Sequence, residues 1–290
     1  MTLLFKPMLA ASQTPDLDKI EYPVLASPKL DGIRCIMADG IPFSRNMKRI
    51  PNQFIQKELM KLQQHGLDGE LMLAEGDFNN VQSGVMSVTG EPKFYLNVFD
   101  NFDLDMFGFW DRYNKTKDIV EELDSPYIRM VEHTVIHSAI ELQFFWSQCI
   151  SEGYEGAMVR SCQGPYKRGR STVKQGYLLK LKVWHDDEAV VIGFEELETN
   201  CNEAQTGELG QTTRSHSKEG MVPADTLGAL VVHWNGVEFK VGSGFDMAMR
   251  HKIWQNQEEF KGKEVTFKYQ EVSKYGKPRF PIFKSFREDK

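Results

Sequence analysis

Several charged side chains lie inside short apolar runs of this sequence, and this placement restricts the folds that the chain can adopt. Lys180 and Lys182 alternate with leucine residues, and Glu70 and Glu155 lie in similar runs. In an extended strand alternate residues share a face, so both lysine ammonium groups point to one side. A charge in an apolar strand is unfavourable unless it is paired or bound by a ligand in a cleft. The sequence therefore predicts several strands that present charges to a common cleft.

Lys29 lies in a segment that fits the same cleft. If this segment is extended, Lys29 and Asp31 share a face, and Gly32 permits a close approach of another backbone. Alone, a lysine beside a carboxylate describes a surface salt bridge equally well. The other runs add further groups. Glu70 and Glu155 supply carboxylates for a metal ion or a ribose, and Phe99 supplies a flat ring for a base. Lys180 and Lys182 supply cations for phosphates. Together these groups predict a nucleotide site with a lysine nucleophile.

The chain of 290 residues is long for a single hydrophobic core, so two domains are expected. In residues 1–185, apolar residues at helical spacing predict helices over 51–65 and 139–150. Short β-rich runs predict strands over 71–73, 94–99 and 130–136. Helices and strands mix irregularly in this first domain, which indicates an α+β fold around antiparallel sheets.

Residues 186–290 are expected to form a smaller, β-rich domain. Asn235–Gly236 lies between two alternating arms, which is typical of a tight hairpin, and strands are predicted over 189–194 and 264–272. Several short strands with one helix in about a hundred residues predict an OB-fold β-barrel, a fold that binds oligonucleotides. The polar stretch 195–225 is too long for a simple turn, which indicates a functional or mobile segment.

The net charge is −6, yet basic residues are concentrated in two segments. Residues 166–184 contain six basic residues and no acidic one, and residues 261–290 contain nine basic against four acidic residues. Such segments can present one cationic face to a phosphate backbone. On charge alone, random clustering on a solvated surface explains them equally well.

Neither the apolar runs nor the cysteines indicate a membrane or an oxidising compartment. No apolar run approaches the roughly 20 residues that cross a bilayer, and no signal-peptide pattern follows Met1. The four cysteines lie far apart and form no CxxC pair. We therefore expect reduced thiols in a cytoplasmic protein with no membrane partner.

The order of these motifs resembles that of the covalent nucleotidyltransferase superfamily and, within it, the minimal ATP-dependent DNA ligases of phages and viruses. The motifs are KxDGxR from Lys29, SRN at Ser44–Asn46, DGE at Asp68–Glu70, FD at Phe99, EGxM from Glu155 and KxK at Lys180–Lys182. The segments 6–10, 78–83 and 279–284 add to the resemblance, which covers essentially the whole chain.

The resemblance implies that the chain seals nicks in double-stranded DNA, in replication, repair or recombination. Lys29 would attack the α-phosphate of ATP and carry AMP as a lysyl-adenylate. AMP would then pass to the 5′-phosphate of the nick, and the neighbouring 3′-hydroxyl would displace it. Mg²⁺, or Mn²⁺ in its place, would join Lys180 and Lys182 in favouring the neutral amine of Lys29 and in stabilising the phosphoryl oxygens.

The resemblance also implies a role for each further site residue. These roles are adenine stacking for Phe99, ribose binding for Glu70, metal binding for Glu155, phosphate contacts for Arg34, Arg45, Lys180 and Lys182, and pyrophosphate orientation for Arg279 with Asp289 and Lys290.

Alternatives remain open on the sequence alone. An mRNA-capping guanylyltransferase shares the lysine chemistry and the two-domain plan but uses GTP, and an RNA ligase belongs to the same superfamily. A non-catalytic nick-binding protein would have no need of five charges in strand-like runs. We also hypothesise that residues 195–225, with Arg214, His216 and Lys218, order against DNA and help the two domains close around the nick. The chain is expected to act as a monomer, and the sequence identifies no protein partner.

Overall fold

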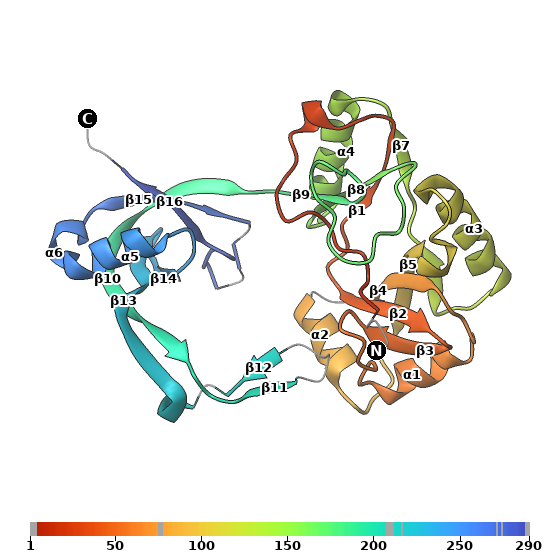
Figure 1. The fold of residues 1–290 in the computed structure, drawn as a ribbon, viewed down its shortest axis with the longest axis horizontal. Helices are drawn as coiled ribbons and strands as arrows, with labels where there is room; N and C mark the ends of the chain where they lie inside the picture. Colours follow the sequence, from red (N-terminus) through yellow and green to blue (C-terminus); the bar gives the residue numbers. More distant parts are fainter. Residues whose placement is uncertain are drawn as a thin grey trace. The chain divides into compact units, whose positions relative to one another are not determined.

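A computed structural model describes residues 5–74, 78–206, 212–215, 217–270, 272–273 and 275–287 (Figure 1). The chain divides into two compact units, one of Met1–Lys182 with Thr206–Thr212 and the other of Val183–Gln205 with Thr213–Lys290. The first unit contains two sheets that are almost wholly antiparallel, with helices between their strands in the sequence, so the fold is α+β. Within the described ranges, no helix is long and apolar enough to cross a membrane.

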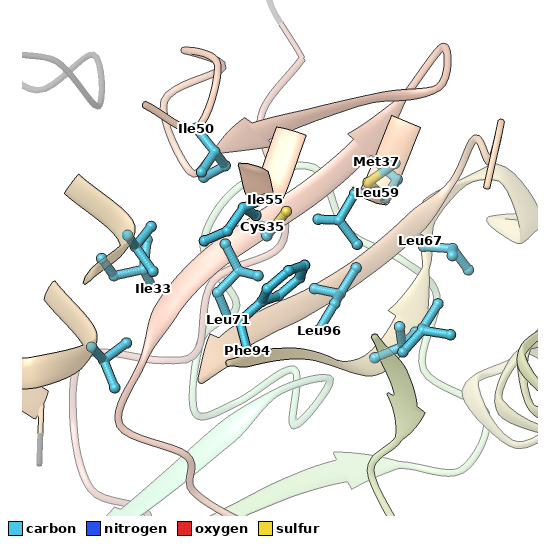
Figure 2. Packing of buried hydrophobic residues seen from close by; sticks show 14 of the residues in the cluster. Ile33, Cys35, Met37, Ile50, Ile55, Leu59, Leu67, Leu71, Phe94 and Leu96 are labelled. Carbon is cyan, nitrogen blue, oxygen red and sulfur yellow. The ribbon is translucent and has the colours of Figure 1, made fainter. Parts of the chain in front are cut away.

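The larger sheet of the first unit has the strand order β3-β2-β4-β5-β6, with only β5 and β6 parallel to each other. Its strands are β2 (Ile33–Ala38), β3 (Ile41–Ser44), β4 (Leu67–Leu73), β5 (Phe94–Asn101) and β6 (Ile128–Met130). Alternate residues of β2, such as Ile33, Cys35 and Met37, point into one buried core (Figure 2). Three helices cover this core: α1 (Gln53–Met60), α2 (Phe78–Met86) and α3 (Phe109–Glu122).

The smaller sheet has the order β7-β1-β8-β9 and is antiparallel throughout. Its strands are β1 (Val24–Pro28), β7 (Thr134–Ile136), β8 (Gly156–Ser161) and β9 (Leu179–Lys182). The helix α4 (Ala139–Ser151) packs on it through Leu142 and Cys149, and a short 3₁₀ helix, η1 (Leu17–Lys19), lies beside α4. The helices predicted over 51–65 and 139–150 are thus confirmed as α1 and α4, although α1 ends earlier than expected.

The strand predicted over 130–136 is wrong as a single element. Residues 128–130 form β6 in the larger sheet, parallel to β5, whereas residues 134–136 form β7 in the smaller sheet, antiparallel to β1. The chain crosses from one sheet to the other between them. Val131 is buried, but the exposed Glu132 and the half-buried His133 interrupt the apolar residues at this crossing.

The second unit is a five-stranded antiparallel sheet in the order β14-β13-β10-β15-β16. Its strands are β10 (His185–Asn200), β13 (Met221–Trp234), β14 (Val237–Val241), β15 (Glu264–Tyr269) and β16 (Ile282–Phe286). The hairpin at Asn235–Gly236 is confirmed, with positive φ angles of 47° and 81°. Two helices, α5 (Met247–Gln255) and α6 (Gln257–Phe260), add Ile253 and Phe260 to a core that is rich in aromatic residues.

The strand order of this unit is open. Among its described residues no ladder joins β14 to β16, and an isolated parallel bridge between Ser243 and Ile282 connects the chain after β14 to β16. The unit is therefore OB-like, and the predicted barrel is not closed by paired strands.

The polar stretch 195–225 contains more regular structure than expected. The arms β10 and β13 extend into it, and its centre contains β11 (Ala204–Thr206), β12 (Thr212–Arg214) and the 3₁₀ helix η3 (Lys218–Gly220). Strands β11 and β12 pair as a two-stranded sheet. His216, Gly207 and Gly210 lie outside the described residues.

Candidate active site

A cavity of about 180 Å³ lies between the two sheets of the first unit. Its walls include Ser27, Met158, Arg160 and Lys180 from the smaller sheet and Arg34, Glu70 and Phe99 from the larger sheet. Lys29 lines the same cavity from the segment in which the chain leaves β1 for β2. Each sheet therefore supplies one side of a single polar and aromatic pocket.

The ammonium group of Lys29 is held at the edge of the smaller sheet. Its backbone N–H donates to the carbonyl of Gly156 at 2.9 Å, which continues the pairing of β1 with β8. Its Nζ forms an ion pair with one carboxylate oxygen of Glu155, and Lys182 pairs with the other oxygen. The Lys29 and Glu155 side chains are 20% and 19% exposed, so the pair is open to a ligand that enters the cavity.

The charges around Glu155 act on one another. Burial alone would raise the pKa of the Glu155 carboxyl, but the nearby ammonium groups of Lys29 and Lys182 outweigh it, and the pKa is lowered. Burial lowers the pKa of Lys180, and the positive charges of Lys182, Arg170 and Lys29 lower it further. The cluster therefore contains more positive than negative charge, which suits polyphosphate oxygens.

Two motif glycines allow the backbones around the cavity to approach closely. A Cβ atom at Gly156 would lie 1.9 Å from the carbonyl oxygen of Leu181 in β9. A Cβ atom at Gly32 would lie 2.3 Å from the carbonyl oxygen of Leu71 in β4. Only glycine fits these two positions. The close approaches hold the segment of Glu155 against β9 and the segment of Lys29 against β4.

Glu70 lies in β4 and faces the cavity. Burial raises the pKa of its carboxyl to about 7, although the positive charges of Arg34 and Lys29 oppose the rise. Glu70 is therefore poised between its neutral and ionised forms near neutral pH, and either form can accept a hydrogen bond from a hydroxyl group.

Arg34 is fixed by a buried carboxylate. Two of its nitrogen atoms pair with the two oxygens of Asp68, which is fully buried, and Nη2 also donates to the carbonyl of Met8 at 3.1 Å. The hydroxyl of Tyr166 donates to the same carboxylate at 2.6 Å. The guanidinium carbon of Arg34 lies 4.7 Å from the centre of the Phe99 ring, which supports one side of that ring.

A second buried charge cluster lies directly behind Phe99. The next residue, Asp100, is fully buried, and its two oxygens accept hydrogen bonds from Arg112 at 2.5 Å and Arg160 at 2.6 Å. Burial would raise the pKa of the Asp100 carboxyl, but the two guanidinium groups lower it. Sequence reasoning gave Asp100 and Arg160 no role, although Arg160 lies two residues after Met158, at the same spacing that places Lys180 and Lys182 on one face.

Most, but not all, of the predicted site residues come together. Those that line the cavity or pair with a residue that lines it are Lys29, Arg34, Glu70, Phe99, Glu155, Lys180 and Lys182. Arg45 instead lies in the exposed turn after β3 and does not line this cavity. Arg279 belongs to the second unit, where its guanidinium lies 5.3 Å from the Phe280 ring centre. Asp289 and Lys290 lie outside the described residues.

Part of the C-terminal basic segment is paired within the second unit. Lys284 contacts Asp186 at 2.7 Å, and Arg287 pairs with Glu188 and Glu264. These pairs reduce the positive charge that the segment can present, which the count of charged residues could not show.

The donor set suits a Mg²⁺ ion that is held largely by its substrate. Within the described residues, no group of three or more acidic, histidine or cysteine side chains could enclose a metal. Mg²⁺ is commonly bound by one or two carboxylates together with water and phosphate oxygens. Glu155 fits that role, provided that the ion displaces the ammonium groups from its oxygens.

Two protein families match the chain. Residues 7–182 match the ATP dependent DNA ligase domain, and residues 220–287 match the DNA ligase OB-like domain. A DNA ligase of Haemophilus influenzae is 28% identical over 267 residues, which cover 91% of this chain and 86% of that protein. DNA ligases of African swine fever virus are 29% identical over 182 residues, and the match covers 57% of this chain and 43% of the viral protein.

Solved structures show the same two-part fold. The Chlorella virus DNA ligase-adenylate has a TM-score of 0.58 and 31% identity over 99% of this chain and all of that one. A structure from work on DNA binding by Lig E DNA ligases, described as a minimal scaffold, has a TM-score of 0.76 and 27% identity over 98% of this chain and all of that one.

Proposed function

This chain belongs to the ATP-dependent DNA ligase family, and from that premise we propose that it seals nicks in duplex DNA through an adenylate carried on Lys29. One observation carries the assignment of Lys29. Its amine lines a cavity that also holds an aromatic ring, Phe99, and a carboxylate, Glu70, and it is paired with the carboxylate of Glu155.

The first step transfers AMP from ATP to the enzyme. The Lys29 ammonium releases a proton to water, and the neutral amine attacks the α-phosphorus of ATP. A phosphorus–nitrogen bond forms while the bond to the bridging oxygen of pyrophosphate breaks, and pyrophosphate leaves with that oxygen. A 5′-phosphate at a nick then attacks the adenylate and frees Lys29. The neighbouring 3′-hydroxyl finally attacks the activated 5′-phosphate, forms the phosphodiester and releases AMP.

The cavity walls suggest how this chain binds ATP. Phe99 offers a flat face to adenine, and Glu70 can accept a hydrogen bond from a ribose hydroxyl. Lys180, which also lines the cavity, places a cation near the α-phosphate, and Lys182 adds a second cation beside Glu155. Positive charge near the reacting phosphate favours the neutral amine and stabilises the charge that develops on the phosphoryl oxygens.

Glu155 is our proposed ligand for Mg²⁺ or Mn²⁺. A bound divalent ion polarises phosphoryl oxygens and neutralises their charge. Glu155 would hold such an ion through carboxylate oxygens that pair with Lys29 and Lys182 here, and the charge of the ion would favour the neutral amine of Lys29. Arg34, fixed on Asp68, is proposed to contact phosphate oxygens of ATP or of the nick.

We propose residues 1–185 as the adenylation domain and residues 186–290 as the DNA-binding domain. In this proposal the exposed Arg45 contacts phosphate, and Arg279 with Asp289 and Lys290 orients pyrophosphate in the first step. The basic segment 166–184 contacts the phosphate backbone of DNA. Those contacts are with phosphates and not with bases, so affinity for a nick should fall steeply with salt concentration.

We also propose that the chain is a monomer that acts on DNA in the cytoplasm. Light scattering of the purified chain tests its oligomeric state.

The decisive experiment tests adduct formation and sealing together. Wild type is incubated with Mg²⁺ and α-labelled ATP or GTP, and the adduct is measured on a denaturing gel. We expect an adduct from ATP, nick sealing with ATP, and neither with Lys29→Ala. Lys29→Arg is the matched control because it keeps the positive charge beside Glu155, but its guanidinium cannot lose a proton at neutral pH. An adduct formed only from GTP would favour a guanylyltransferase, and an adduct on either variant would remove Lys29 as the nucleophile.

Two further variants test Arg279 and the segment that contains β11 and β12. Arg279→Ala should slow self-adenylation more than the sealing of a nick that is already adenylated, and equal losses would contradict a role with pyrophosphate. Replacing residues 203–218 with a short glycine-serine turn should weaken nick binding if this segment, which includes β11 and β12, orders against DNA. Unchanged affinity and sealing would eliminate that hypothesis.

A further inference from the structure

The two sheets of the first unit are joined by a buried ion pair beside the cavity. Asp100 belongs to β5 of the larger sheet, and Arg160 belongs to β8 of the smaller sheet. Nη1 of Arg160 lies 2.6 Å from Oδ2 of Asp100. The Arg160 side chain is 4% exposed and the Asp100 side chain is fully buried, so little water competes for this contact.

The anchor on the Asp100 side is itself rigid. Arg112 of α3 donates from Nε to Oδ1 of Asp100 at 2.5 Å and from Nη1 to the carbonyl of Phe107 at 2.7 Å. The Asp100 carboxylate also accepts a hydrogen bond from the backbone N–H of Asn101 at 2.8 Å. Both carboxylate oxygens are therefore bound, so the position of Asp100 is well determined.

The same ion pair lies next to the residues that form the base pocket. Phe99 directly precedes Asp100, and Met158 lies two residues before Arg160 on the same face of β8. Phe99, Met158 and Arg160 all line the cavity. The guanidinium carbon of Arg160 lies 5.6 Å from the centre of the Phe99 ring. A shift of β5 against β8 would therefore move Phe99 relative to Met158.

We propose that Asp100 and Arg160 are positioning residues for the nucleotide base, because their ion pair sets the width of the slot between Phe99 and Met158. This inference rests on the proposed function, in which Phe99 is the platform for adenine. A flat base contacts both walls well only when each lies about 3.5–4 Å away. A gap of about 0.5–1 Å already removes a quarter to a half of the contact energy. A pair that links the two strands thus controls affinity for the base without touching it.

The test separates the base side of the pocket from the phosphate side. Adenosine, which has a base and a ribose but no phosphate, and inorganic pyrophosphate are each used as inhibitors of self-adenylation by ATP. Asp100→Asn keeps the shape of the side chain but removes its charge. We expect the inhibition constant of adenosine to rise roughly tenfold and that of pyrophosphate to stay within about twofold. Arg160→Lys, which keeps a cation but shortens its reach, should raise the adenosine constant by a smaller factor.

Asn52→Ala controls for a general loss of stability. Asn52 is fully buried, accepts a hydrogen bond from the N–H of Ile55 at 2.9 Å, donates to the carbonyl of Ser87 at 2.9 Å, and does not line the cavity. Its loss should lower the melting temperature and leave both inhibition constants unchanged.

Each outcome decides between the proposals. An unchanged adenosine constant in Asp100→Asn, or equal changes for adenosine and pyrophosphate, would overturn the positioning role. If Asp100→Asn does not fold, the two inhibition constants are compared in Arg160→Lys instead. An unchanged inhibition constant of adenosine in Arg160→Lys would likewise overturn the positioning role. Failure of the wild type to form any adduct with ATP would instead refute the proposed function.

Discussion

The ammonium group of Lys29 is paired with the carboxylate of Glu155, although the two residues lie 126 positions apart in the chain. The register of the smaller sheet brings them together, because Pro28 of β1 lies opposite Ala157 of β8. Lys29, which follows the last residue of β1, and Glu155, which precedes the first residue of β8, therefore meet at the cavity. Pairing between two strands thus fixes the contact on which the proposed chemistry depends.

Glu155→Gln should impair self-adenylation and shift its metal dependence. The amide leaves Lys29 and Lys182 without their counter-ion and is a poor ligand for Mg²⁺. We expect the rate of adduct formation to fall by about 100-fold and the half-saturating Mg²⁺ concentration to rise, as measured by quenched-flow assays across a Mg²⁺ titration. Glu152→Gln, at the exposed end of α4, is the control and should leave both unchanged. A normal Mg²⁺ dependence in Glu155→Gln would argue against metal binding at this carboxylate.

Glu70→Gln should stabilise the protein at alkaline pH. The pKa of Glu70 is raised from 4.5 to about 7 in the folded chain, so the folded state binds more protons than the unfolded state between these values. The contribution of Glu70 to stability therefore falls as the pH rises through this window. Glutamine resembles the neutral form at every pH, so its advantage should be small near pH 5 and about 1–3 kcal/mol near pH 8.

Urea denaturation at the two pH values measures this difference. The variant should also bind ATP more weakly at alkaline pH, if an ionised Glu70 accepts the ribose hydroxyl more strongly. A stability difference that does not depend on pH would show that Glu70 has an ordinary pKa.

Gly156→Ala should reduce adduct formation more than the backbone strain of an alanine at a positive φ angle explains. The new Cβ atom would collide with the carbonyl oxygen of Leu181, so β8 and β9 must separate, and Glu155 moves with them. We expect a loss of about 2–4 kcal/mol in stability and little adduct. Gly153→Ala is the matched control, because Gly153 also has a positive φ angle, 86°, but a Cβ there would meet no atom within 4 Å. Equal effects of the two variants on adduct formation would contradict this account.

Asp68→Asn should be strongly destabilising. The substitution leaves the half-buried guanidinium of Arg34, which is 16% exposed, without its counter-ion. Breaking a fully buried pair costs about 3–5 kcal/mol, so we expect a loss of about 2–3 kcal/mol here. Adding Arg34→Met should restore part of the stability, because the unpaired charge is then removed. Chemical denaturation of the wild type, both single variants and the double variant measures the coupling. Additive losses would mean that the two residues do not act as a pair.

Several of the predicted residues gather at one cavity, although their roles there remain proposals. Glu70, Phe99 and Lys180 follow a local rule, in which a charged or aromatic residue alternates with apolar residues along a strand, and Lys29 and Glu155 lie just beyond the ends of β1 and β8. That rule needs no knowledge of which strands pair. The mixed α+β character and the hairpin at Asn235–Gly236 follow from equally local signals.

Contacts between distant strands were not predictable in this way. Arg160 lies in an apolar run of β8, but no local pattern shows that it pairs with Asp100, because this contact joins two different sheets. Which of the two sheets each part of residues 128–136 joins was not predictable for the same reason. The open strand order of the second unit depends on which strand edges meet, and hydropathy carries no information about that.

The chain passes from one sheet to the other at Lys29 and passes back between Met130 and Thr134. As a consequence, the larger sheet is built from one continuous stretch of sequence, whereas the smaller sheet needs strands from both sides of that stretch, and the cavity has both of its walls only when the two sheets are complete. If Lys29 carries AMP as proposed, its reaction with ATP reports that both sheets of the first unit have formed.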